Sequence, residues 1–139
     1  VQAQIMELLH DLQQDTGMGL ILITHDLAVV AEVCDRVVVM YAGEIMEDGE
    51  IDDVYHHPAH PYTLGLMDSI PRTDMHIDRL TPIQGAPPDL LNIPSGCPFH
   101  PRCPYVQPRC SQDEIEPVRI GQGGHQSSCF YWEEVQRDI

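Results

Sequence analysis

Apolar residues in the first quarter of the chain recur with helical spacing on either side of one unbroken apolar run. Segment 1–14 carries the i, i+3, i+4, i+7 pattern of a buried helix face on Ile5, Leu8, Leu9 and Leu12. Gly17 is a suitable helix stop. Residues 20–24, "LILIT", do not alternate, which favours a short strand covered on both faces, as in a parallel sheet. Helical spacing returns over 27–34, and the order helix, strand, helix predicts an α/β layer architecture.

The following residues predict a β-hairpin and a short helix. Residues 37–41 and 44–47 are two strand-like runs, and residues 42–43 between them form the connection. A turn is predicted at residues 48–49, where the second strand should end. Residues 51–55 are then expected to form a short helix.

The composition of the chain changes near Pro71. A helix is predicted to begin at Pro61, which suits a first helical turn, and to end before Pro71. Beyond that point prolines become dense and four of the five cysteines appear. We therefore expect a boundary near residues 71–80, with one domain over 1–70 and a small, irregular, cysteine-rich domain over 71–139. Such a small domain needs a cross-link because its hydrophobic core is limited.

The chain is strongly acidic, with 22 acidic against 7 basic residues and a formal net charge of −15. This balance argues against non-specific binding to nucleic acid or to an anionic membrane surface, because both favour basic patches. No run approaches the ~20 apolar residues of a membrane span. The first residues lack an initiator Met and the basic start of a signal peptide, so we expect a cut made inside a larger protein.

His25 directly follows the predicted strand and precedes the second predicted helix. In open α/β sheets, ligands collect beyond the carboxyl ends of the strands. An imidazole at such a place can donate to a phosphate oxygen or position a water molecule. Asp26 can cap the helix that follows. The alternative interpretation is an ordinary polar residue that closes a strand.

The five cysteines divide into one and four. Cys34 shares the apolar face of the second predicted helix, where a thiol packs as a small hydrophobic group. The proline-rich part of the chain contains the other four, Cys97, Cys103, Cys110 and Cys129. They allow disulfides, which suit a secreted module, or a zinc ion, although the C-x₂₋₄-C pairs typical of structural zinc are absent. An iron–sulfur cluster, which accepts looser spacing, is the third possibility.

Three stretches of the sequence resemble one known family. "GLILITHDLAVVAEVCDRVVVMYAGEIMEDG" resembles the switch-histidine region of the ATP-binding subunits of ABC transporters. "HHPAHPYTLGLMDSIP" and "GAPPDLLNIPSGCPFHPRCP" resemble the tail of the oligopeptide/dipeptide importer branch, and "HHPAHP" is expected to be a connector into the next helix. The implied fold is α/β: the C-terminal part of a P-loop ABC ATPase core, with helix–strand–helix plus hairpin, followed by the small cysteine-rich domain.

The resemblance implies that His25 senses the γ-phosphate of ATP and couples ATP binding to closure of two nucleotide-binding subunits. ATP and Mg²⁺ would be cofactors of the parent chain, which would be a peptide-transporter ATPase. The family's phosphate-binding loop G-x-x-x-x-G-K-[ST], its signature motif and its catalytic glutamate are absent from the 139 residues. This segment alone is therefore expected to be inactive.

The resemblance also implies a cofactor and partners. It implies a [4Fe–4S] cluster, with zinc as the alternative, on Cys97, Cys103, Cys110 and Cys129. It implies membrane permease subunits, a second ATP-binding subunit and, indirectly, an extracytoplasmic peptide-binding protein as partners, and no nucleic acid. The expected location is peripheral, on the cytoplasmic face of the cell membrane, where disulfides are disfavoured. A stand-alone cysteine-cluster module with a redox or regulatory role is the alternative function.

Overall fold

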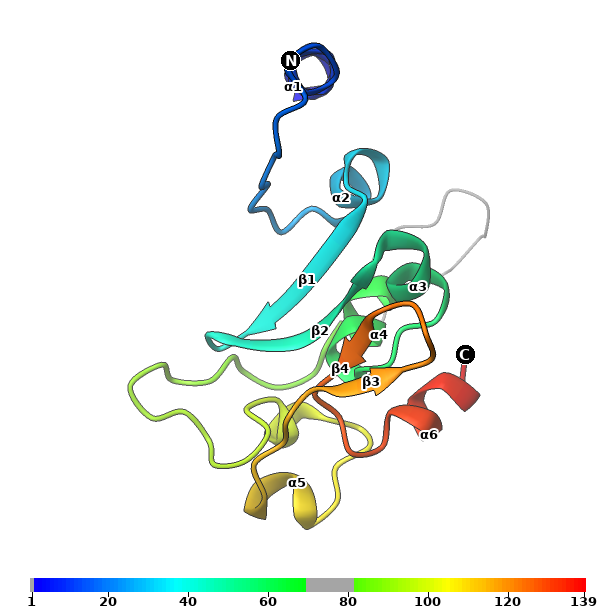
Figure 1. Cartoon of the computed structure of the whole chain (residues 1–139). Helices are drawn as coiled ribbons and strands as arrows, with labels where there is room; N and C mark the ends of the chain where they lie inside the picture. Colours follow the sequence, from blue (N-terminus) through cyan, green and yellow to red (C-terminus); the bar gives the residue numbers. More distant parts are fainter. Residues whose placement is uncertain (1, 70–81) are drawn as a thin grey trace, which may run out of the picture. The chain divides into compact units, whose positions relative to one another are not determined.

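The computed structural model describes residues 2–69 and 82–139. The chain divides into two compact units, residues 1–34 and residues 35–139 (Figure 1). No helix within the described ranges has the length and apolar character needed to cross a bilayer. The domain boundary predicted at residues 71–80 lies outside the described residues and stays a prediction.

The first unit consists of the two predicted helices, α1 (Gln2–Thr16) and α2 (Leu27–Val33). Gly17 ends α1 with a φ of +66°, and its N–H donates to the carbonyl of Gln13 at 2.8 Å. This is the left-handed cap that glycine adopts without a steric cost. The helix stop predicted at Gly17 is confirmed.

The segment between α1 and α2 is not the predicted strand. Residues 20–24 join no sheet in the described part of the chain, and the side chains of Ile21 and Ile23 are 91% and 95% exposed. A strand needs a neighbouring backbone to pair its N–H and C=O groups, and the described residues offer this segment none. The predicted buried face of α1 is also wrong, because Ile5, Leu8 and Leu12 are exposed among the residues that the structure describes.

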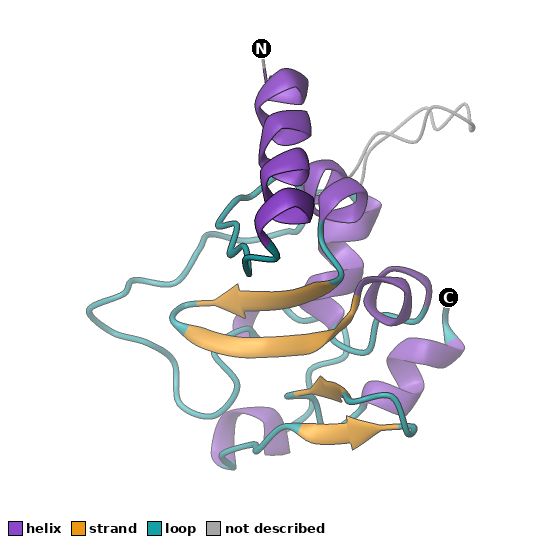
Figure 2. Cartoon of the chain, turned by 45° about the horizontal axis from the view of Figure 1, so that its top comes forward, coloured by secondary structure: helices purple, strands orange, loops and turns teal. Residues whose placement is uncertain are grey.

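The second unit is built on a four-stranded antiparallel sheet of order β1-β2-β4-β3 (Figure 2). Its strands are β1 (Arg36–Tyr41), β2 (Glu44–Glu50), β3 (Val118–Ile120) and β4 (His125–Ser127). An α/β fold is confirmed at this level, and the predicted hairpin is confirmed as β1 and β2. The parallel-sheet strand predicted at residues 20–24 is not part of this sheet, in which every pairing is antiparallel. The predicted hairpin is joined to strands that lie more than 65 residues later in the chain.

The hairpin connection follows from two residues that accept positive φ. Ala42 and Gly43 have φ of +51° and +84°, the pattern of a type I′ turn, whose twist matches that of the flanking strands. The turn predicted at residues 48–49 is wrong, because both residues continue β2. An added Cβ at Gly49 would lie 3.0 Å from Cγ2 of Val54. The glycine there permits close packing of α3 on the strand.

Helices flank the sheet. Two are the predicted ones, α3 (Ile51–His56) and α4 (Pro61–Asp68). The cysteine-rich part adds a 3₁₀ turn and two short helices: η1 (His100–Arg102), α5 (Arg109–Gln112) and α6 (Trp132–Arg137). A core of Tyr41, Met46 and Phe99 connects the hairpin with the cysteine-rich part, and the Tyr41 and Phe99 rings meet edge to face at 5.3 Å.

Candidate functional site

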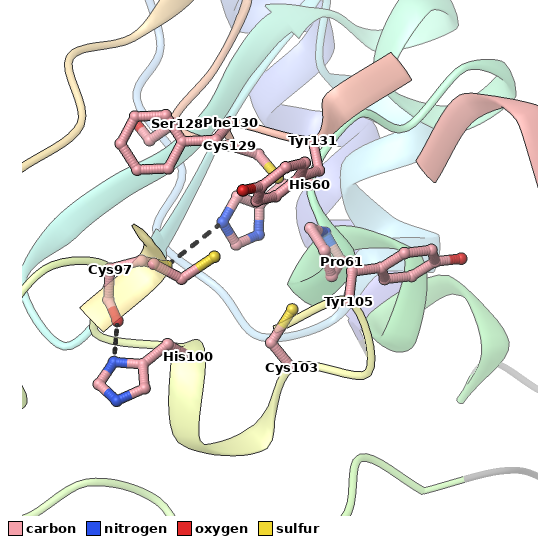
Figure 3. Close-up of a pocket in the computed structure, with 11 residues that line it drawn as sticks. His60, Pro61, Cys97, His100, Cys103, Tyr105, Ser128, Cys129, Phe130 and Tyr131 are labelled. Atoms are coloured by element: carbon pink, nitrogen blue, oxygen red, sulfur yellow. Dashed lines mark hydrogen bonds between the residues drawn. The ribbon is translucent and has the colours of Figure 1, made fainter. Parts of the chain in front are cut away.

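One pocket of the second unit brings together the four cysteines predicted to act as a group. Its lining consists of these cysteines and residues from the start of α4, from η1 and the loop after it, and from the segment before α6 (Figure 3): Cys97, Cys103, Cys110, Cys129, His60, Pro61, His100, Tyr105, Ser128, Phe130 and Tyr131. The predicted ligand residues therefore lie at one cavity, although up to 32 residues separate them in sequence. Their role as ligands stays a prediction.

The backbone around Gly96 positions two of the cysteines. The N–H of Cys97 donates to the carbonyl of Cys110 at 2.9 Å. Gly96 has a φ of +69°, and an added Cβ would overlap the carbonyl oxygen of Cys110. Only glycine allows this close approach in this conformation. The short "SGCP" stretch thus fixes the first cysteine against α5, which carries the third.

Backbone N–H groups point at the sulfurs of three cysteines. The donor is in each case the residue two positions later, with one additional donor at Cys97: Phe99 and His100 to Cys97, Tyr105 to Cys103, and Tyr131 to Cys129. These bonds favour the thiolate. Burial has the opposite and larger effect: it raises the pKa of the Cys97 thiol and raises the pKa of Cys103 and Cys129 to about 12. A cation in the pocket would reverse this balance.

The four thiols are donors of the kind that both zinc and iron–sulfur clusters take. Within residues 2–69 and 82–139, no three His, Cys, Asp or Glu side chains are grouped so as to hold a metal ion. Zinc needs four donors about 2.3 Å from a single point, whereas a cluster is larger and is held by thiolates that accept N–H bonds. The cavity measures about 20 Å³, room for roughly one water molecule, and would have to widen for a cluster. None of the five cysteines, all within the described residues, forms a disulfide.

Two histidines line the pocket and face Cys97 differently. Nδ1 of His60 accepts a hydrogen bond from the N–H of Tyr62 at 3.1 Å, and its Nε2 lies 4.0 Å from Sγ of Cys97. Nδ1 of His100 instead donates to the carbonyl of Cys97 at 2.9 Å. His60 thus faces the sulfur, whereas the ring of His100 lies beside the carbonyl (Figure 3). Burial lowers the pKa of His60 to about 3, so its ring is neutral at pH 7.

Glu47 on β2 is a fully buried carboxylate that the sequence analysis missed. It accepts hydrogen bonds from the N–H groups of Ala59 and His60 at 2.8 and 3.0 Å. Its third partner is Nε2 of His125 at 2.7 Å. Three donors compensate the loss of water around the carboxylate. The "HHPAHP" segment, interpreted only as a connector, supplies both backbone donors and one wall of the cysteine pocket.

His25 lies in the first unit, at the start of α2. Its side chain is exposed. The neighbouring Asp26 holds the cap, since its Oδ1 accepts from the N–H groups of Ala28 and Val29 at 3.0 and 3.3 Å. The capping role predicted for Asp26 is confirmed. The local fold of α2 does not use the His25 imidazole, and its predicted role at a phosphate stays a prediction.

Comparison with known proteins gives consistent matches. Residues 46–110 match the family "Oligopeptide/dipeptide transporter, C-terminal region". The oligopeptide transport ATP-binding protein OppD of Haemophilus influenzae is 53% identical over 110 residues, and OppD of Escherichia coli is 48% identical over 124. The dipeptide transport ATP-binding protein DppD of Bacillus subtilis is 49% identical over 138 residues. These alignments cover 79%, 86% and 99% of this chain, but only 34%, 37% and 40% of the relatives.

Proposed function

The chain belongs to the family of oligopeptide/dipeptide transport ATP-binding proteins, whose C-terminal region its residues 46–110 match, and we propose that it is part of the ATP-hydrolysing subunit of a peptide importer. The supporting observation is the high identity, over nearly the whole chain, to proteins named for peptide transport and ATP binding. In this proposal the parent chain binds ATP and Mg²⁺ through motifs that these 139 residues lack. It works on the cytoplasmic face of the membrane with permease subunits, a second ATP-binding subunit and, indirectly, an extracytoplasmic peptide-binding protein.

Within this function, His25 contacts the γ-phosphate of ATP. Its side chain is exposed and Asp26 alone provides the side-chain cap of α2, so the imidazole is available to a ligand. An imidazole can donate to a phosphate oxygen or orient the attacking water. The residue would act together with phosphate-binding groups outside this segment.

A chimera tests both proposals. This chain replaces the corresponding region of the Escherichia coli relative, and ATP hydrolysis and peptide uptake are measured. The chimera should support both activities, and His25→Ala should lower hydrolysis at least ~100-fold, the usual contribution of a positioned proton-transfer group. His10→Ala, which changes an exposed histidine of α1, is the matched control. Full hydrolysis by the His25→Ala chimera would contradict the catalytic role.

We also propose that Cys97, Cys103, Cys110 and Cys129 hold a [4Fe–4S] cluster. The support is that the four thiols line one cavity and that three of them accept backbone N–H bonds. When bound, the cluster would supply a cross-link and a one-electron centre. The chain's own residues would shield it, with Phe130, Tyr131 and Tyr105 forming part of the wall.

Metal analysis of protein purified without oxygen tests this second proposal. The chain should contain about four iron and four sulfide per molecule, and Cys97→Ser should lose most of the iron. Cys34→Ser, which changes the cysteine outside the pocket, should keep it. Zinc alone, or no metal, would contradict the cluster. Iron in the protein together with an inactive chimera would favour the alternative, a cysteine-cluster module with a redox or regulatory role.

A further inference from the structure

We propose that His60 is a positioning residue of the cysteine pocket, whose Nε2–H donates to the sulfur of Cys97 and tunes whatever that sulfur binds. The tuning effect rests on the proposed cluster, of which Cys97 is a proposed ligand, whereas the hydrogen bond between His60 and Cys97 does not require a cluster. It assigns a role to a histidine that the sequence pattern places in a simple connector.

The His60 ring is held from several sides. Its backbone N–H donates to Oε2 of Glu47 at 3.0 Å, and its Nδ1 accepts from the N–H of Tyr62 at 3.1 Å. The centroids of the His60 and Phe99 rings lie 6.0 Å apart, and His60 is 1% exposed. The remaining ring nitrogen, Nε2, faces Sγ of Cys97 at 4.0 Å. The imidazole therefore cannot turn away from the sulfur without losing its helix-capping bond.

The hydrogen bond at Nδ1 fixes which nitrogen carries the proton. A backbone N–H can only donate, so Nδ1 must present its lone pair, and the ring proton of neutral imidazole is then on Nε2. A protonated Nε2 is a donor to sulfur and not a metal ligand. The sulfur of Cys97 thus receives the Nε2–H of His60 and the backbone N–H groups of Phe99 and His100.

Donors of this kind act on a bound cluster through its charge. Each N–H bond to a ligand sulfur stabilises the more negative, reduced state and raises the reduction potential. The proposed bond also joins two segments that are far apart in the sequence. It links His60, the N-cap of α4, with Cys97, which lies 37 residues later in the turn before η1. His60 would therefore couple the Glu47 network of the sheet to the electronic state of the pocket.

Variants of the two pocket histidines separate a tuning role from a structural one. In the full chain, loaded with iron and sulfide without oxygen, His60→Asn keeps an oxygen that can cap α4 but removes the imidazole donor. It should retain its iron and shift the one-electron equilibrium about threefold toward the oxidised state. His100→Asn, which changes the histidine bonded to a carbonyl, should leave the equilibrium unchanged. Equal midpoint potentials in the wild-type and His60→Asn chains would overturn the inference.

A measurement on metal-free protein that keeps His60 decides the question even where His60→Asn does not fold or no cluster forms. Long-range ¹H–¹⁵N correlation spectra of the reduced, metal-free protein should show His60 as the Nε2–H tautomer. Its Nε2 proton signal should move in Cys97→Ser but stay in place in Cys103→Ser. An Nδ1–H tautomer, an imidazolium, or equal responses to both serine variants would overturn the inference. Absence of iron from all variants would instead contradict the proposed cluster and leave this test intact.

Discussion

The two compact units use apolar residues in opposite ways. In residues 35–139, buried side chains from the hairpin and from the cysteine-rich part form a common core, and a buried carboxylate finds three hydrogen-bond donors. Among the described residues of 1–34, one apolar side chain, that of Val30, is buried. Ile21 and Ile23 are almost fully exposed. Residues 1–34 are the more apolar of the two segments, so composition does not explain the difference.

The difference lies in long-range pairing. In the second unit β2 pairs with β4, and Glu47 bonds to His125, 78 residues later in the chain. The described residues give the first unit two helices and no sheet. An apolar run becomes a strand only where another backbone satisfies its polar groups.

The largest expected effect is on the buried carboxylate of Glu47. Glu47→Ala should lower the free energy of unfolding of the second unit by about 3–5 kcal/mol, because it leaves two N–H groups and His125 buried without their acceptor. Denaturant unfolding followed by the fluorescence of Trp132, the one tryptophan in the sequence, measures it. Glu44→Ala changes an exposed carboxylate of the same strand and should have little effect. Similar losses for both variants would show that the network does not hold the sheet.

The second prediction concerns the loss of folding stability at acidic pH. The pKa of His60 is about 3 in the folded chain and about 6.5 when unfolded. Between these values the unfolded chain binds more protons, so folding stability falls as the pH drops below about 6.5. At pH 4 this histidine alone should cost about 3 kcal/mol, at about 1.4 kcal/mol per pH unit. The measurement compares the unfolding free energy of metal-free wild-type and His60→Asn protein at pH 7 and pH 4. The variant should lose less stability on acidification, and an equal loss would contradict the buried neutral ring.

The third prediction compares two glycines with similar backbone conformations. Gly17 and Gly96 have φ of +66° and +69°, but an added Cβ meets nothing within 4 Å at Gly17 and overlaps a carbonyl oxygen at Gly96. Gly17→Ala should cost about 1 kcal/mol from backbone strain alone. Gly96→Ala should cost about 3 kcal/mol, because overpacking adds to the same strain.

Circular dichroism of α1 and Trp132 fluorescence measure the two glycine variants separately. Gly96→Ala should also reduce the iron content, since it moves Cys97 away from Cys110. Equal costs at the two glycines would show that the chain accommodates the overlap at Gly96 by a small backbone shift.

Local signals in the sequence predicted the local structure well. The helix stop at Gly17, the Asp26 cap, the two-residue hairpin connection and the Pro61 helix start each depend on residues within one turn of chain. The strand at residues 20–24 failed, because a strand depends on a partner that its own residues do not specify. The turn at residues 48–49 failed because Gly49 serves packing against α3.

The sequence predicted the cysteines of the candidate site but not Glu47 or the position of His60, because the latter two depend on contacts that are distant in the chain. The grouping of the four cysteines could be inferred from their unusual density in a proline-rich segment. Glu47 carries no such signal: at a hairpin position next to Asp48 it looks like an exposed acidic residue until β4 is known to pair there. His60 likewise gains its position opposite Cys97 only through contacts made 37 residues away.

The smallest expected effect lies in the first unit. Asp26→Ala removes the side-chain acceptor for the N–H groups of Ala28 and Val29 and should cost about 1 kcal/mol, the usual value of a helix cap. Faster hydrogen exchange at the amide of Val30, which bonds to the carbonyl of residue 26, would measure it. Asp26→Asn keeps a capping oxygen and should exchange at nearly the wild-type rate.

The loss at Asp26 should remain within the first unit, because Asp26, Ala28 and Val29 all belong to that unit. The Trp132 unfolding transition of Asp26→Ala should therefore coincide with that of the wild-type chain. A shift of that transition by the full cost of the lost cap would mean that α2 and the sheet unfold as one cooperative body. The contrast between the two units would then be one of packing and not of stability.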